Sequence, residues 1–188
     1  VCISIVEKFF VLFIDKVIAA TPAIASKFNP KKSVLVQNFP IINELVTDKG
    51  GSYCDRDLAI TFIGYITYIR GAKEMIETIE SLSKLMPGVK LEMGGEIYPN
   101  DLKKEICSLP GWNYVNYHGF VSRKQMTKIF SKCRVGVILF HDVPNHINSQ
   151  PNKLFEYMSA GLPVVASDFP LWRQIIGEAK CGLLVNPT

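Results

Sequence analysis

Short apolar runs alternate with longer amphipathic stretches from residue 58 to residue 185. The runs have the length of buried strands, whereas the stretches between them place apolar side chains three and four positions apart, as helices do. Strands that alternate with helices predict βαβ units and a parallel sheet. We therefore expect an α/β fold with a doubly wound, Rossmann-like parallel sheet, preceded by a fragment of a second α/β domain.

The same pattern predicts where the elements lie. Strands of the main sheet are predicted at residues 59–64, 89–94, 115–117, 135–140, 164–167 and 182–185. Helices are predicted at residues 71–86, 100–109, 122–133 and 170–177, with a further short helix that ends before Gly161. Nearer the N-terminus we expect helices at residues 1–15 and 22–28, and strands at residues 17–20 and 33–37.

The chain divides at a polar segment. Residues 47–57 include a Gly-Gly-Ser run, and we interpret them as a linker between residues 1–46 and residues 58–188. The apolar stretch at residues 1–20 is interrupted by charged side chains, so a membrane-crossing helix is not expected there. It also lacks a basic leader and a small-residue cleavage site, so a signal peptide is not supported.

Charge and cysteine content narrow the class of protein. The net charge is +4 and no block of like charges occurs, so we expect anionic small molecules rather than nucleic acid as ligands. The five cysteines are scattered and form no C-x-x-C pair. This pattern suits reduced thiols in a cytoplasmic protein better than a disulfide framework or a zinc site.

One short helix carries the densest set of signals. Ser149 is predicted to cap it, Pro151 suits its first turn, and Gly161 is predicted to end it in the left-handed conformation. Glu156 lies inside this helix beside its apolar face, where it is either an ordinary solvated side chain or a functional one. The first-turn amides, together with Lys153, would form a ready site for an anion.

Ligands on doubly wound sheets bind at the carboxyl ends of the strands, so the loops there hold the other candidates. The loop from Gly64 to Arg70 is either a flexible turn or a close backbone approach with a cation for a phosphate. The polar loop from His141 to His146 matches no metal-ligand spacing, so it is expected to line a pocket rather than to hold a metal. Dinucleotide, Walker and nucleophile-elbow motifs are missing. The residues alone therefore predict a domain that binds a phosphate-bearing ligand.

Residues 151–167 closely resemble the donor-site segment of GT-B glycosyltransferases of family 4, the group 1 type. Shorter segments resemble other parts of that family in the same order, at residues 62–71, 91–96, 118–121 and 181–185. Residues 17–40 resemble the end of the family's acceptor domain and its crossover. The resemblance implies that residues 58–188 form the donor domain and that residues 1–46 end the N-terminal acceptor domain.

The resemblance also implies a chemistry. A sugar would pass from a nucleotide-diphosphate sugar to a glycan or lipid-linked acceptor, with retention at the anomeric carbon and with neither a metal nor another cofactor. The catalytic residue is not identified. The implied donor-binding residues are Gly64, Arg70, Asn148, Ser149, Gln150, Asn152, Lys153 and Glu156, with Gly119, Phe120 and Val121 bordering the base. Among them, Arg70 would bind the diphosphate, Glu156 the ribose hydroxyls, and the backbone amides of Ser149, Gln150 and Asn152 the sugar or diphosphate.

The sequence departs from the family pattern at three positions. Asn148 stands where the first glutamate of the E-x7-E motif is usual, and Tyr65 stands where an arginine is usual. Arg70 replaces the usual lysine. One phosphate-binding cation is therefore missing, and Arg70, Lys153 and the helix terminus would have to compensate.

Length is the remaining departure. A complete enzyme of this type is about twice as long as these 188 residues, so we expect a fragment, truncated at its C-terminus, that binds nucleotide without turnover. The apolar segment at residues 1–14 is expected to make it self-associate. The parent would be cytoplasmic, in peripheral contact with the inner face of the membrane. The alternative is a non-catalytic nucleotide-binding or regulatory α/β module.

Overall fold

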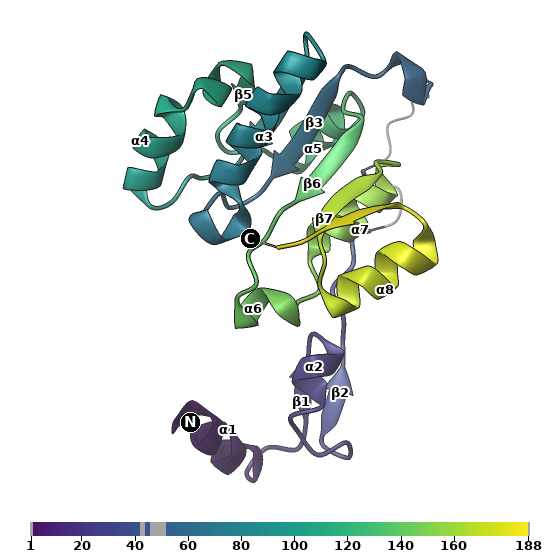
Figure 1. The fold of residues 1–188 in the computed structure, drawn as a ribbon. Helices are drawn as coiled ribbons and strands as arrows, with labels where there is room; N and C mark the ends of the chain where they lie inside the picture. The colour runs from purple at the N-terminus through teal and green to yellow at the C-terminus, as the bar shows by residue number, and fades with distance from the viewer. Residues whose placement is uncertain (1, 42–43, 46–51, 188) are drawn as a thin grey trace.

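The computed structural model describes residues 2–41, 44–45 and 52–187, and its centre is a six-stranded parallel sheet (Figure 1). The order of the strands is β5-β4-β3-β6-β7-β8. Their bounds are β3 (Ala59–Ile63), β4 (Lys90–Gly94), β5 (Val115–Tyr117), β6 (Val135–Ile138), β7 (Val164–Ser167) and β8 (Gly182–Val185). The order runs outward in both directions from β3 and β6, so the switch point of the sheet lies between these two strands.

Helices cover both faces of this sheet. They are α3 (Ala72–Leu85), α4 (Asn100–Ser108), α5 (Arg123–Phe130), α6 (Pro144–Ile147), α7 (Asn152–Ser159) and α8 (Pro170–Ala179), with short 3-10 turns η1 (Tyr53–Asp55), η2 (Tyr68–Arg70) and η3 (Pro110–Tyr114). Right-handed crossovers place α3 and α4 on one face and α5 and α7 on the other. The core between these layers contains fully buried apolar side chains from every layer, among them Phe62, Ile76, Leu91, Phe130, Tyr157 and Trp172.

A smaller N-terminal unit lies beside this domain (Figure 1). It contains α1 (Cys2–Val11), β1 (Val17–Ala19), α2 (Pro22–Ala25) and β2 (Ser33–Leu35), and β1 pairs with β2 in parallel. The segment after β2 reaches the main domain, where the Phe39 and Phe155 rings lie 4.8 Å apart. Within the described residues, no helix has the length and apolar character needed to cross a membrane.

The predicted α/β fold and its parallel sheet are confirmed, and β5, β7 and β8 have the predicted bounds. The N-terminal helix ends earlier than predicted, at Val11, and α2 ends at Ala25. Helix α6 and the turn η3 were not predicted, because each is too short to show a helical period. Residues 47–51 of the predicted linker lie outside the described residues, and its described part, residues 52–57, contains the turn η1.

The predicted start of α7 is wrong. Pro151, rather than Ser149, is the N-cap, and it makes no side-chain cap. The Ser149 hydroxyl instead donates to the His146 carbonyl at 2.8 Å, because α6 ends immediately before it. The end of α7 is as predicted: Gly161 has a φ of +63°, and the Leu162 amide donates back to Tyr157 at 2.9 Å.

Tyr157 holds α7 against the switch point of the sheet. Its side chain is fully buried, and its hydroxyl donates to the Thr61 carbonyl of β3 at 3.1 Å, with the Val137 carbonyl of β6 at 3.4 Å. Its ring also occupies the space that a side chain at Gly136 would need. A single hydroxyl therefore couples the helix to both central strands.

Replacing Tyr157 by Phe should lower the free energy of unfolding by about 1–2 kcal/mol, because a buried hydrogen bond to the sheet is lost. Urea-induced unfolding measures the change. Tyr98→Phe is the matched control: Tyr98 is 58% exposed, and its replacement should change the free energy by less than about 0.5 kcal/mol. Equal effects of the two substitutions would show that the Tyr157 hydroxyl does not stabilise the sheet.

Candidate functional site

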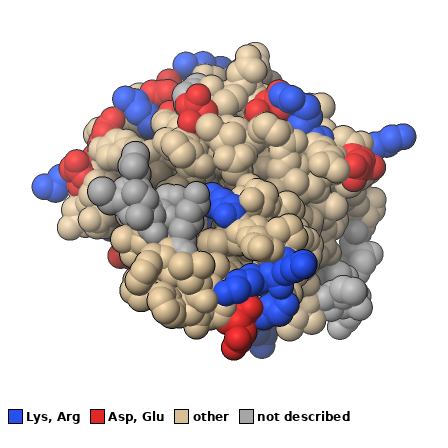
Figure 2. Space-filling model, turned by 90° about the horizontal axis from the view of Figure 1, so that it is seen from below, with Lys and Arg blue, Asp and Glu red and all other residues tan. Residues whose placement is uncertain are grey.

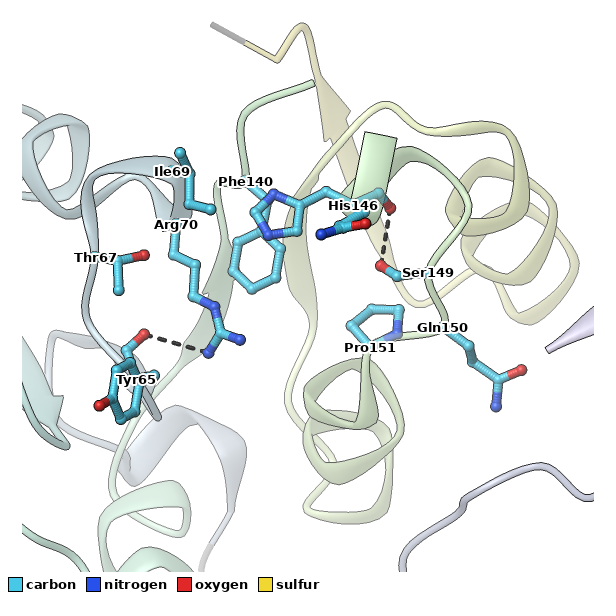
Figure 3. A pocket seen from close by; sticks show the side chains of 10 residues that line it. Tyr65, Thr67, Ile69, Arg70, Phe140, His146, Ser149, Gln150 and Pro151 are labelled. Carbon is cyan, nitrogen blue, oxygen red and sulfur yellow. Dashed lines mark hydrogen bonds between the residues drawn. The ribbon is translucent and has the colours of Figure 1, made fainter. Parts of the chain in front are cut away.

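A hollow of about 450 Å³ opens at the carboxyl ends of β3 and β6 (Figure 3). One wall is the loop after β3, and the other is the segment from α6 to the start of α7. The lining residues are Tyr65, Thr67, Ile69, Arg70, Phe140, Asn145, His146, Ser149, Gln150 and Pro151. The hollow lies at the switch point, where doubly wound sheets bind their ligands.

Three strand-end loops meet beside this hollow. The Gly64 amide donates to Gly94 at 2.8 Å, and the Gly95 amide donates to Gly119 at 2.6 Å. A side chain at Gly95 would collide with the Gly64 carbonyl. The predicted candidate loops after β3, β4 and β5 are thus brought together, because glycine lets their backbones approach closely.

Arg70 lies at the end of η2, and its side chain points into the hollow (Figure 3). One guanidinium nitrogen donates to the Tyr65 carbonyl at 3.4 Å, and the guanidinium lies 5.3 Å from the centre of the Phe140 ring. Burial lowers the pKa of Arg70. Within the part of the chain that the structure describes, no carboxylate pairs with it.

Lys153 projects from the first turn of α7 toward the start of the loop after β3, beside the hollow but not among its lining residues. Its ammonium occupies the space that a side chain at Gly64 would fill, and it lies 5.5 Å from the centre of the Phe62 ring. Burial lowers the pKa of Lys153 to about 8. Across residues 2–41, 44–45 and 52–187, no carboxylate lies within ion-pair distance of this ammonium. Two cations without a carboxylate partner therefore converge at the start of α7, which is the arrangement of an anion site.

Glu156 is not an ordinary solvated helix residue. Its side chain is 14% exposed, and its Oε1 pairs with Nη1 of Arg123 on α5. Arg123 also donates to both oxygens of Glu44, at 3.3 and 2.8 Å. The second oxygen of Glu156 has no partner among the described residues, so the carboxylate can still accept a hydrogen bond from a ligand.

The residues from Asn148 to Asn152 lie in the segment before α7 and in its first turn. Asn148 is exposed and does not line the hollow. The Ser149 amide donates to His146 at 3.0 Å, so it is not free to face a ligand as expected. The Gln150 side chain bonds to Gln37 and, at 3.5 Å, to the Asn38 carbonyl of the N-terminal segment. Asn152 is exposed in the first turn of α7, beside Lys153.

The turn after β5 lies at the same edge of the sheet. Gly119 has a φ of +62°, and Phe120 is 89% exposed. The Val121 side chain fills the space that a side chain at Gly94 would need. The role of these three residues beside a base stays a prediction.

The polar loop from His141 to His146 was expected to line a pocket, and Asn145 and His146 do line the hollow. Sequence reasoning did not select Phe140 or Arg123. Only the tertiary structure pairs Arg123 with Glu156. His141 pairs with Glu74 at 2.8 Å, and no group of three side chains among the described residues could hold a metal ion.

Figure 2 shows lysine and arginine side chains at several separate places around one face, with one group of them beside an acidic side chain.

Comparisons with solved structures identify the fold as the Rossmann-like domain of the GT-B type. HepE from Anabaena, solved with UDP-glucose, is 19% identical with a TM-score of 0.66, over 92% of this chain and 50% of that one. TarM is 22% identical with a TM-score of 0.72, over 96% and 36%. The pneumococcal O-GlcNAc transferase GtfA, solved with UDP and GlcNAc, is 17% identical with a TM-score of 0.67, over 93% and 34%.

The chain therefore spans about half the length of HepE. No curated protein sequence matches it. The family model described as glycosyl transferases group 1 matches residues 47–188, which is most of the chain. The chain belongs to the group 1 glycosyl transferases.

Proposed function

We propose that this chain provides the nucleotide-diphosphate-sugar site of a glycosyltransferase that acts on a glycan or lipid-linked acceptor. The observation that carries the proposal is the convergence of Arg70 and Lys153, neither paired with a described carboxylate, at the start of α7. The family match supports it. So do the relatives, because HepE was solved with UDP-glucose and GtfA with UDP and GlcNAc.

The diphosphate would lie between the two cations. Arg70 approaches from the loop after β3, and Lys153 approaches from α7 together with the free amides of the first turn. Tyr65 stands where the family usually has an arginine, and Lys153 supplies the second positive charge in its place. The ribose hydroxyls would donate to the free oxygen of Glu156, and the turn at Gly119 would border the base.

This arrangement suits the departure of a nucleoside diphosphate. Negative charge grows on the diphosphate as its bond to the sugar breaks, and Arg70 and Lys153 would stabilise that charge. Because the cations come from side chains, we propose transfer without a bound metal. From the family match we also propose retention at the anomeric carbon.

The glycan or lipid-linked acceptor needs a binding surface of its own opposite the nucleotide sugar. The chain spans 50% of HepE, so we propose that it binds the donor without turnover and that transfer requires a further domain. The exposed apolar side chains of its N-terminal unit, among them Phe9, Phe10 and Ile18, would then promote self-association. We propose that the full-length protein lies in the cytoplasm, in peripheral contact with a membrane. We also propose that it takes part in polysaccharide synthesis.

A second candidate is a non-catalytic nucleotide-binding or regulatory module. The exposure of Asn148 outside the hollow favours it, because this position would otherwise contact the donor sugar. A donor site must accommodate the sugar, whereas a nucleotide sensor need not. Binding of a nucleotide sugar at least as tight as that of its nucleoside diphosphate would support the donor site over the sensor.

Calorimetric titration with UDP, GDP, ADP and their glucose esters tests the proposal. At least one nucleotide should bind, and Glu156→Ala should weaken it by ~1–3 kcal/mol, because a charged hydrogen bond to the ribose is lost. Arg123→Gln is the control: it removes the same ion pair but no ligand contact, and should change the affinity by less than about 0.5 kcal/mol. No binding by the folded protein would refute the donor site. Equal effects of the two substitutions would show that Glu156 supports the fold and does not contact the nucleotide.

Lys153→Met should raise the stability of the fold and weaken the binding of the nucleotide. At pH 7 both the folded and unfolded chains carry the Lys153 proton, and burial makes the folded charge costly. The variant should therefore be more stable by ~1–3 kcal/mol while binding the nucleotide more weakly. As the pH rises from about 8 toward 10.5, the folded lysine loses its proton before the unfolded one, and the gain in stability should shrink.

Denaturant titrations at several pH values, with calorimetry at pH 7, measure both effects. Lys84→Met, at an exposed position at the end of α3, is the matched control and should change neither property. A less stable Lys153→Met variant, or one with unchanged nucleotide affinity, would contradict the assignment of Lys153 as an unpaired ligand-binding cation.

A further inference from the structure

We propose that His146 contacts the sugar of the donor, its Nε2 accepting a hydrogen bond from a sugar hydroxyl. The proposal rests on the donor site described above and adds a residue that selects the sugar. Figure 3 shows the His146 ring against the Phe140 ring, at the wall of the hollow opposite Thr67 and Tyr65.

His146 is held by backbone hydrogen bonds and by the Phe140 ring. Its amide donates to the Val143 carbonyl at 2.8 Å, and its own carbonyl accepts from the Ser149 hydroxyl at 2.8 Å. Its ring centre lies 4.6 Å from that of Phe140. The residue is 7% exposed, yet it lines the hollow, so the ring is fixed at a wall rather than free on the surface.

The hydrogen bonds of the ring determine which nitrogen carries the proton. Nδ1 lies 3.1 Å from the His141 carbonyl, and a carbonyl only accepts, so Nδ1 must donate. Burial and the nearby Arg70 charge lower the pKa of His146, which leaves the imidazole neutral at neutral pH. Nε2 then has a lone pair and no hydrogen, and no described residue donates to it.

A hydrogen-bond acceptor at the position of Nε2 favours the sugar of the nucleotide sugar over its diphosphate. The diphosphate has no proton to donate at neutral pH, so its oxygens would gain nothing from Nε2. A sugar hydroxyl donates readily. The hollow also offers the Phe140 ring beside His146 and the Ile69 side chain of the opposite wall, which are apolar and suit the C–H face of a hexose. His146 thus fits the transferred sugar, with the diphosphate at Arg70 and Lys153.

The substrate class follows from this contact. The donor should carry a hexose with a free hydroxyl at the position that faces His146. A sugar that is deoxygenated or substituted there would not donate to Nε2, and the loss of that hydrogen bond would weaken its binding. His146 would therefore determine sugar specificity without taking part in the bond that breaks.

Two substitutions of similar size test the proposal. In His146→Asn the amide nitrogen can replace Nδ1 as donor to the His141 carbonyl, but nothing replaces Nε2. In His146→Gln the longer side chain can bring an acceptor to the place of Nε2. The measured quantity is the ratio of the dissociation constants for UDP and UDP-glucose, or for the GDP or ADP pair if one of these binds instead. Thermal unfolding confirms that each variant is folded.

His146→Asn should bind UDP as the wild type does and bind UDP-glucose about 5- to 30-fold more weakly, the range expected for one lost hydrogen bond. His146→Gln should recover part of that loss. An unchanged ratio, or an equal loss of UDP and UDP-glucose, would overturn the proposal, and the second result would mean that His146 only supports the fold. Absence of nucleotide binding by the wild type would instead refute the donor site itself.

Discussion

The close approach of α7 to the loop after β3 is the constraint on which this site depends. Gly64 has no side chain, and the Lys153 ammonium occupies the space that this leaves. The ammonium is thereby withdrawn from solvent, which lowers its pKa to about 8. A buried cation that lacks a described carboxylate partner is costly to the fold, and an anionic ligand would offset that cost.

The sheet holds this arrangement in place. Its strand order reverses between β3 and β6, so the loops after these strands diverge and leave a hollow between them. Tyr157 hydrogen-bonds to β3 from the helix that carries Lys153 and Glu156. Trp172 on α8 donates to the Ser149 carbonyl at 2.8 Å and fixes the segment before α7. The candidate ligand groups are therefore positioned by rigid elements, which favours a preorganised site.

Much of the fold could be predicted from the sequence, because parallel strands buried on both faces are continuous apolar runs and their helices keep a period of 3.6. What failed were features that depend on tertiary contacts. Ser149 has the composition of an N-cap, but α6 ends beside it and takes its hydroxyl. Asn148 falls in the motif position of a sugar-binding glutamate and its side chain is exposed, so its contact with a donor sugar stays a prediction. Glu156 pairs with Arg123 on another helix, and because these two residues are 33 positions apart, no local pattern predicts the pairing.

Arg70 and Lys153 are proposed to bind the diphosphate of a nucleotide sugar. A crystal structure of the protein with the nucleoside diphosphate that it binds best would test this. We expect phosphate oxygens within about 3 Å of the Arg70 guanidinium and the Lys153 ammonium, with a ribose hydroxyl at the same distance from Glu156. A diphosphate bound away from both cations would contradict it.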